Sequence, residues 1–271
     1  MFKLLRKIKN KSSNFVATIE TQVMHFRWKN FRSKNYSPEN HKVRMLVIRK
    51  SEYVELARIC VLSFLYLYPN SKIQIYCDEV TYSPLEKSLR KLISRKSVIL
   101  IRLESQLQSW QNEKLSLILK MNGTNELFLD ADLRWNGLMN LEAGKCLFFA
   151  DEFVLRNKSP YRQYLAQFES NANTERASMK NSSFFTFGGN KLETLEIECV
   201  WNAFNNHEQK LGLADIGAED HLMLSRLSEQ LALSIASANW SFPISYLKTS
   251  DSIVDGQFVE SCYFGATGRK F

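Results

Sequence analysis

The sequence predicts an α/β fold with one mainly parallel central sheet that is flanked by helices. Two observations predict it. Between residues 43 and 132, short apolar runs alternate with segments of helical periodicity, each about 11 to 16 residues long. Connections of this length suit right-handed crossovers between parallel strands. The chain has 271 residues, 45% of them hydrophobic, and is long enough to bury a sizeable core around such a sheet.

The elements of this alternating half lie close together along the chain. The first strand is expected at 43–49, and Ser51 is expected to cap the next helix, which ends at Pro69. The second helix is expected to carry Pro84 in its first turn. The remaining elements of this half are expected strands at 72–79, 98–103 and 126–132 and expected helices at 81–93 and 108–122.

The second half of the chain has a looser pattern. Strands are expected at 146–152 and 182–189, and helices at 190–206 and 219–231. We expect these elements to extend the same sheet, so that residues 43–271 form one domain behind an N-terminal arm.

That arm, residues 1–42, differs from the rest in charge. It contains ten Lys or Arg and two acids, which equals the +8 net charge of the whole chain, so the remainder is neutral. Apolar residues recur among these cations at roughly helical spacing, and aromatic residues alternate with basic ones at 26–32. Such a basic amphipathic arm is typical of contact with an anionic membrane surface. The alternatives are a helix packed on the domain and, least favoured because the neutral remainder offers no second basic surface, a nucleic-acid contact.

Cysteine usage and hydropathy bear on location. The five cysteines are widely spaced and form no CxxC pair, which argues against a disulfide framework or a zinc site and favours a reducing compartment. The longest apolar stretch, 59–68, is far shorter than the roughly 20 residues that span a bilayer. The N-terminus lacks the unbroken apolar core of a signal peptide. We therefore expect a cytoplasmic protein, peripheral on the inner face of a membrane.

The most informative segment is ELFLDADLRWNG, residues 126–137. Its apolar strand ends abruptly in Asp130 and Asp132, and alternate residues of a strand face the same way, so both carboxylates can converge at the strand's end. Two hard oxygen ligands suit Mg²⁺ or Mn²⁺ rather than a soft metal. The alternative is a pair of acids that simply end a strand in a solvated turn.

In this setting, LFLDAD resembles the DxD motif of GT-A nucleotide-sugar glycosyltransferases, and residues 113–132 are most similar to the glycogenin-like retaining family. The resemblance implies a Rossmann-like GT-A domain, a nucleotide-sugar donor (a UDP-sugar is favoured), and Mn²⁺ or Mg²⁺ held by Asp130 and Asp132 against the donor diphosphate. In that family a basic residue lies about 16 positions before the first Asp. Lys114 occupies this position and would neutralise charge on the diphosphate; otherwise it is a solvated helix lysine.

Two later segments are similar to other parts of GT-A enzymes. SFFTFGGNK resembles the strand that closes over the donor sugar, where Gly188 and Gly189 would let the backbone approach a ligand, unless they only form a tight turn. GAEDHLMLSRL resembles the GxED helix start of inverting enzymes and brings Glu219 and Asp220 to the site, with Asp220 as catalytic base. Acids also favour helix N-termini for electrostatic reasons alone. The GAED segment favours inversion, whereas the spacing of Lys114 and Asp130 favours retention, so both outcomes stay open.

Three more positions are weaker candidates. Asp78 and Ser51, each just after a strand, could contact the base or ribose of the donor, although structural roles are favoured for both. Near the C-terminus, CYFGATGRKF resembles the glycogenin-like motif that begins with a metal-ligating His, but Cys262 stands in place of that His. The third protein ligand of the metal is therefore not assigned.

These features together favour a metal-dependent glycosyltransferase that moves a sugar from a nucleotide-sugar to a glycan or lipid-linked acceptor in cell-surface polysaccharide or glycoconjugate synthesis. One alternative is a haloacid dehalogenase-like phosphatase that uses Asp130 and Asp132. That family's motif usually ends the first strand of the chain, not the fourth, and Arg134 stands where it usually has Thr or Val. A second alternative is an inactive GT-A scaffold.

Overall fold

The computed structural model describes residues 39–104, 109–121, 125–135, 146–149, 153–154, 178–180, 182–237, 240, 244–247 and 261–262. The expected N-terminal arm lies almost wholly outside these residues, as does the segment after Cys262. The helices, strands and contacts of the fold given below all lie within these ranges.

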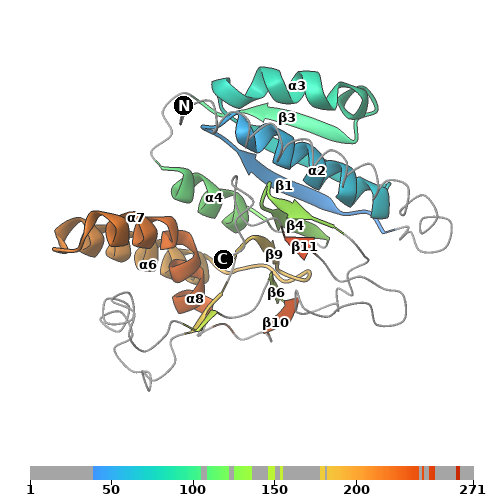
Figure 1. Ribbon diagram of the computed structural model, residues 1–271. Coiled ribbons are helices and arrows are strands. Elements are labelled where there is room, and N and C mark those ends of the chain that lie inside the picture. Colours follow the sequence, from blue (N-terminus) through green and yellow to red (C-terminus); the bar gives the residue numbers. More distant parts are fainter. Residues whose placement is uncertain are drawn as a thin grey trace, which may run out of the picture.

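Seven of the described strands form one sheet in the order β10-β6-β9-β4-β1-β2-β3 (Figure 1). Its strands are β1 (Lys42–Val47), β2 (Lys72–Cys77), β3 (Val98–Arg102), β4 (Glu126–Leu129), β6 (Cys146–Phe149), β9 (Phe184–Thr186) and β10 (Ile244–Leu247). The pairs β1–β2, β2–β3, β1–β4 and β10–β6 are parallel, and β9 runs antiparallel to both β4 and β6. The predicted α/β class with a mainly parallel sheet is confirmed, and the second half of the chain adds strands to it.

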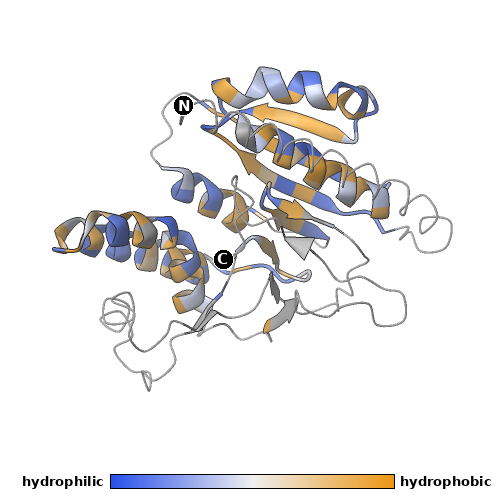
Figure 2. Cartoon of the chain, in the orientation of Figure 1, coloured by the Kyte–Doolittle hydropathy of each residue, from blue (hydrophilic) through white to orange (hydrophobic). Residues whose placement is uncertain are grey.

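Helices cover both faces of this sheet. The helices are α2 (Glu52–Leu67), α3 (Glu79–Ser94), α4 (Trp110–Leu119), α6 (Thr194–Leu213), α7 (Ala218–Arg226) and α8 (Ser228–Ser237). Alternate strand residues enter different cores: Leu127 and Leu129 pack in a cluster with α2 and α3, whereas Phe128 packs in a cluster with α4, α6 and α8. Figure 2 shows the apolar strands between more polar outer helices. The sheet is thus buried from both sides, as its continuous apolar runs predict.

Two short antiparallel pairs complete the described strands. β5 (Leu133–Arg134) pairs with β11 (Ser261–Cys262), and β7 (Phe153–Val154) pairs with β8 (Ser178–Met179). The first pair matters for the site because β5 begins directly after Asp132. No helix in the described part of the chain is long and apolar enough to cross a bilayer.

Three details differ from the expected elements. The α3 helix begins at Glu79 because the Asp78 carboxylate accepts the Thr81 N–H, so Pro84 lies inside the helix rather than in its first turn. Ser51 occupies the N-cap position of α2, but its side chain makes no capping hydrogen bond. The single helix expected at 219–231 is two helices, α7 and α8, because the Ser228 hydroxyl bonds the Ser225 carbonyl where the first ends.

Candidate active site

The strand order places the end of β4 at a change of direction in the sheet. From β1 the chain builds β2 and then β3 outward, and it then returns to place β4 on the other side of β1. The crossover helices α2 and α3 pack on one face, and α4 packs on the opposite face. In open α/β sheets, ligands bind outside the carboxyl ends of the strands at such a switch point. Asp130 comes directly after β4 and therefore lies there.

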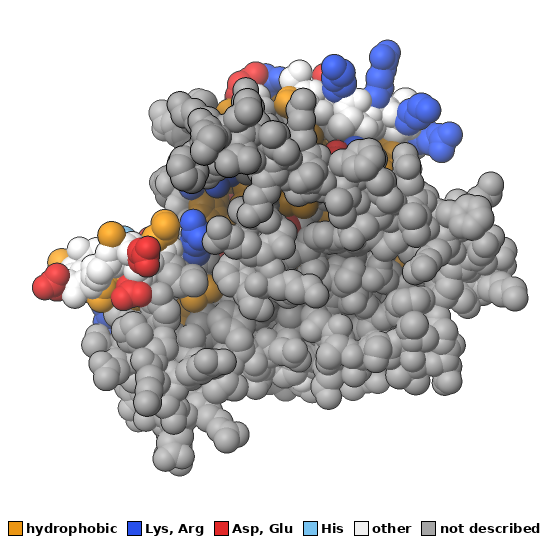
Figure 3. Space-filling view, viewed as in Figure 1, with side chains coloured by type: hydrophobic (Ala, Val, Ile, Leu, Met, Phe, Trp, Pro, Cys, Tyr) orange, Lys and Arg blue, Asp and Glu red, His pale blue; other side chains and the backbone are white. Residues whose placement is uncertain are grey.

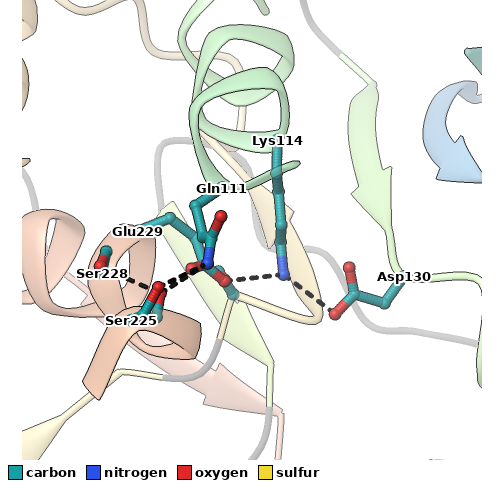
Figure 4. A network of polar contacts seen from close by, with 7 residues as sticks. Gln111, Lys114, Asp130, Ser225, Ser228 and Glu229 are labelled. Atoms are coloured by element: carbon teal, nitrogen blue, oxygen red, sulfur yellow. Dashed lines mark hydrogen bonds and ion pairs between the residues drawn. The ribbon is translucent and has the colours of Figure 1, made fainter. Parts of the chain in front are cut away.

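A buried lysine connects Asp130 to a second carboxylate (Figure 4). Lys114 Nζ lies 3.0 Å from Asp130 Oδ2 and 3.3 Å from Glu229 Oε1. Lys114 is 3% exposed and Glu229 is 0% exposed, whereas the Asp130 side chain keeps 26% exposure. The cluster is therefore closed on the side of α4 and α8 and open only at Asp130.

Helix periodicity explains why Lys114 points inward. It precedes Leu117 and Ile118 by three and four positions, so it shares their buried face of α4. The helix starts where the Ser109 hydroxyl accepts the Asn112 N–H. The aliphatic stem and ammonium of Lys114 then reach across the sheet, with Nζ 5.5 Å from the centroid of the Phe128 ring.

The corner between α7 and α8 holds Glu229 in place. Gln111 of α4 donates a 2.7 Å hydrogen bond to the Ser225 carbonyl, which fixes the end of α7 against α4. Ser228 bonds Glu208 of α6 on the other side. Figure 4 shows Gln111 and Lys114 side by side on α4, with Ser225, Ser228 and Glu229 facing them.

The electrostatics of this cluster depend on burial and on the three charges. Burial raises the pKa of Glu229, and the Lys114 charge opposes that rise. Burial lowers the pKa of Lys114, but the charges of Asp130 and Glu229 outweigh it and the pKa is raised overall. Glu229 Oε2 has no hydrogen-bond partner among the described residues. With the carboxylates ionised, one cation faces two anions, so a second cation near Asp130 is favoured.

The loop that carries the two aspartates is anchored by its backbone. The Asp130 N–H donates to the Ser183 carbonyl at 2.7 Å, and the Leu133 N–H donates back to the Asp130 carbonyl at 3.3 Å. The Cys60 thiol lies 3.6 Å from that carbonyl. Burial, followed by the charges of Asp132 and Asp130, raises the pKa of this thiol. The loop is therefore held against α2, which carries Cys60.

The donor set fits a divalent cation that also needs substrate ligands. No group of three His, Cys, Asp or Glu in the described part of the chain is arranged to hold a metal by itself. Asp130 and Asp132 offer hard oxygens, and Mg²⁺ is commonly bound by one or two carboxylates plus substrate phosphates. The aspartates alone would thus form half of a site that a bound diphosphate completes.

Asp78, expected as a donor contact, has a structural role in this fold. Its Oδ1 accepts the N–H and the hydroxyl of Thr81 at 3.0 and 2.8 Å. Its Oδ2 accepts the N–H of Arg49 at 2.6 Å, and Arg49 adopts φ 72°. Both oxygens are therefore engaged in joining the turn after β1 to the start of α3.

The two glycines after β9 do not approach the aspartates. Because β9 is antiparallel to β4, with Phe184 opposite Leu129, its beginning lies beside Asp130 and its end lies beside the beginning of β4. Gly188 and Gly189, with φ of 57° and 92°, turn the chain at that far edge. Ser51, by contrast, comes after β1 and lies at the switch-point edge, exposed to solvent.

Glu219 and Asp220 occupy the first turn of α7. The second carboxylate that pairs with Lys114 comes from α8 rather than from this turn. Gly217 occupies the N-cap position of α7. A Cβ built on Gly217 would lie 3.9 Å from Asp220 Oδ2, so the Asp220 carboxylate turns back toward the N-terminus of its own helix. The assignment of Glu219 and Asp220 as catalytic acids stays a prediction.

Glu229 was not predicted as a site residue, although the sequence around it contains an informative pattern. Ala232, Leu233 and Ala236 follow Glu229 by three, four and seven positions, so this acid lies on the apolar face of a helix. An ionisable group on such a face must be paired or neutral. That rule, applied to 228–237, points to a buried partner such as Lys114.

Comparisons with known proteins give no close relative. The sequence matches no known protein-family profile and no curated protein. The galactosyltransferase LgtC in complex with donor and acceptor sugar analogues is similar over 76% of this chain and 72% of its own, at 13% identity and a TM-score of 0.45. The PaToxG glycosyltransferase is similar over 81% of this chain and 77% of its own, at 12% identity and a TM-score of 0.35. The mannosyltransferase PcManGT from Pyrobaculum calidifontis, in complex with GDP-Man and Mn²⁺, is similar over 86% of each chain, at 12% identity and a TM-score of 0.32.

Proposed function

We propose that this protein is a nucleotide-sugar glycosyltransferase whose donor diphosphate binds at the carboxyl end of β4. One observation carries the proposal: a buried lysine, Lys114, is held 3.0 Å from the carboxylate that ends a strand at the switch point of the sheet. Burying an ammonium group is costly unless it is paired. Its place beside an acid pair open to solvent suits the recognition of a phosphate group with a bound cation.

The residues have distinct roles in this proposal. Asp130 and Asp132 would hold Mn²⁺ or Mg²⁺, which supplies positive charge to the diphosphate as the leaving group departs. Lys114 adds a second positive charge from the side of α4. Glu229 positions Lys114 and keeps it charged when Asp130 turns toward the cation. It is a positioning residue because its contacts among the described residues are with Lys114 and the buried Ser182 hydroxyl and not with the open side of the cluster.

Nucleotide-dependent stabilisation tests this proposal directly. Thermal unfolding would be measured with UDP, GDP or CMP, each with and without Mn²⁺. We expect one nucleotide, UDP first, to raise the melting temperature only when Mn²⁺ is present, since binding to the native state raises its apparent stability. Lys114→Gln should weaken that shift, and Lys120→Gln, at the exposed end of the same helix, serves as the matched control. Equal shifts in both variants would remove Lys114 from the site.

The acceptor and the stereochemistry belong to the proposal as well. We place Asp220 as the base that takes the proton of an acceptor hydroxyl, which requires inversion at the sugar carbon. Asp220→Asn should lower transfer by roughly 10²-fold with donor binding nearly unchanged. The anomeric coupling constant of the product, measured by NMR, decides the matter, because a retained configuration contradicts a base role for Asp220.

The proposed acceptor is a glycan or a lipid-linked sugar, with a place in cell-surface polysaccharide or glycoconjugate synthesis. Residues 1–42 would hold the enzyme at the cytoplasmic face of an anionic membrane. Sedimentation of the full chain with anionic vesicles should weaken as salt rises, because surface attraction is screened. Removal of residues 1–38 should weaken it further, and unchanged binding would contradict a membrane role for the arm.

The phosphatase and scaffold alternatives gain no support from the geometry. Asp130 comes after the fourth strand in chain order, whereas the phosphatase motif is expected after the first. The ion pairs that orient Lys114 toward Asp130 favour a working site over an inactive scaffold.

A further inference from the structure

The outer face of α3 carries a dense group of cations. Lys87, Lys91 and Arg95 are exposed and lie four residues apart, and exposed Arg90 follows Lys87 by three, so they share one face of the helix and its end. The opposite face, with Leu85 and Leu89, is buried on the sheet. Lys96 extends the group beyond the helix. We call Lys87, Arg90, Lys91, Arg95 and Lys96 the α3 basic face.

This basic face is not neutralised within the described part of the chain. None of its five cations takes part in a salt bridge there, whereas Arg102 at the other end of the same layer pairs with Glu79 at 3.1 Å. In Figure 3, Lys and Arg side chains stand out together at the upper right, over α3. The helix dipole accounts for a cation in the last turn, such as Lys91, but not for Lys87 one turn earlier. The neutral composition of residues 43–271 therefore conceals a second basic surface that the sequence analysis did not expect.

An apolar groove adjoins these cations. A groove of about 420 Å³ runs between α3 and β3, the edge strand of the described sheet, and Ile93, Val98, Ile99 and Leu100 line it. Lys72, Lys96, Tyr82 and one acid, Glu86, also line it. Ile99 is 43% exposed although it belongs to a strand of the sheet. Cations beside exposed aliphatic side chains match the two layers of a lipid surface, charged headgroups above and hydrocarbon beneath.

We propose that the α3 basic face and the adjoining edge of β3 dock on an anionic lipid surface. The residues of this contact are other than those of the N-terminal arm and of the donor site. Each Lys or Arg near such a surface changes the partition coefficient by about fivefold, so five cations form a substantial site.

Charge argues against the chain's own arm as the occupant of this face. Residues 1–38 contain nine Lys or Arg and one Glu, so the arm and the α3 basic face repel each other. Two basic surfaces that repel are instead both attracted to one anionic sheet of lipid.

Nucleic acid is the less favoured partner because the described residues of this basic face include no free aromatic ring. Single-stranded sites combine cations with free aromatic faces, and residues 86–96 contain no aromatic residue. The nearby ring of Tyr82 is already covered by Arg102, whose guanidinium carbon lies 4.3 Å from the ring centroid.

Vesicle sedimentation with charge-matched variants tests the proposal. The full-length chain would be mixed with phosphatidylglycerol and phosphatidylcholine vesicles, or with vesicles of phosphatidylcholine alone. Arg90→Gln/Lys91→Gln should lower partitioning to the anionic vesicles by about tenfold or more. The control Lys191→Gln/Arg226→Gln removes the same charge at exposed positions elsewhere and should change partitioning by less than about twofold. Equal effects of the two double variants would overturn the proposal.

Acetylation footprinting of the unaltered chain is an independent measurement. Anionic vesicles should protect Lys87, Lys91 and Lys96 from acetylation, while Lys191 stays reactive and neutral vesicles protect none of them. Unprotected lysines on α3 in a vesicle-bound chain would overturn the proposal. Protection by a single-stranded RNA but not by anionic vesicles would also overturn it and would identify a nucleic-acid surface instead.

Discussion

Two parallel strands of the sheet, β2 and β4, are each followed directly by an aspartate. The two carboxylates have different surroundings. Asp78 after β2 accepts hydrogen bonds from Thr81 and from the Arg49 backbone, so both oxygens are occupied by neutral donors of the fold. Asp130 after β4 bonds through Oδ2 to the buried Lys114 and keeps a partly exposed side chain.

The difference comes from the element that begins after each acid. Glu79 begins a helix immediately after Asp78, and the free N–H groups of its first turn take up the carboxylate. A turn and the short strand β5 come after Asp130, and they offer few such donors. In this fold, the acid that stays open to a ligand is therefore the one after which no helix starts at the next residue.

Removal of charge from the aspartate loop should have the largest effect. Asp130→Asn or Asp132→Asn keeps the side-chain shape but removes an anionic ligand, so metal-dependent turnover of the nucleotide-sugar should fall by roughly 10²-fold or more. Initial rates at several Mn²⁺ concentrations measure it. Near-normal turnover in either variant would contradict the metal assignment and would make Asp130 no different from Asp78.

Loss of the lysine should affect stability most. Lys114→Met leaves Asp130 and Glu229 without their buried cation, which should lower the free energy of unfolding by about 3–5 kcal/mol. Urea unfolding measures the change. Lys114→Met/Glu229→Leu removes both buried charges and should recover much of the loss. A loss below about 0.5 kcal/mol in the single variant would mean that the buried cluster is not formed.

Asp78→Ala should have a smaller effect and only on stability. It removes the helix cap and leaves the Arg49 N–H without its partner, which should cost about 1–2 kcal/mol in urea unfolding. The Mn²⁺-dependent nucleotide shift should stay as in the parent protein. If that shift disappears while the stability is kept, Asp78 contacts the donor and the contrast with Asp130 is wrong.

The smallest expected effect is a pH dependence that depends on Glu229. Because its pKa is raised above the ordinary value of 4.5, the folded protein binds this proton more tightly than the unfolded chain does. The resulting stabilisation is complete below 4.5 and is lost as the pH rises through the folded-state pKa. Glu229→Gln should therefore gain stability relative to the parent as the pH rises, by at most about 1.4 kcal/mol per pH unit. Parallel stability curves for the two proteins would contradict the raised pKa.

Sequence periodicity was sufficient for the parallel half of the fold. Strand runs such as 72–79 and the helix after Ser51 are predicted by local patterns, and the structure has them within a few residues. Asp130, Asp132 and the spacing to Lys114 were also visible, because the DxD segment and α4 are close in the chain. In the structure, Lys114 forms an ion pair with Asp130.

Contacts between elements far apart in the chain could not be predicted from local sequence patterns. The antiparallel course of β9, which takes Gly188 and Gly189 away from Asp130, depends on which strand it joins and not on its own residues. Likewise, the contact of Glu229 with Lys114 joins positions 115 residues apart and depends on how α8 packs on α4. The basic face of α3 was not predicted because the net charge of residues 43–271 as a whole is zero.

The pairing of β5 with β11 has a consequence for the order of folding. It places Cys262 opposite Leu133, one residue after the second aspartate, although nearly half of the chain separates them. Each pairing among β1, β2 and β3 closes through a single crossover helix, a shorter and cheaper loop. Contacts of high sequence separation form slowly, and a chain leaving the ribosome presents its N-terminal part first. The pairing of β5 with β11 is therefore expected to form after the pairings among β1, β2 and β3.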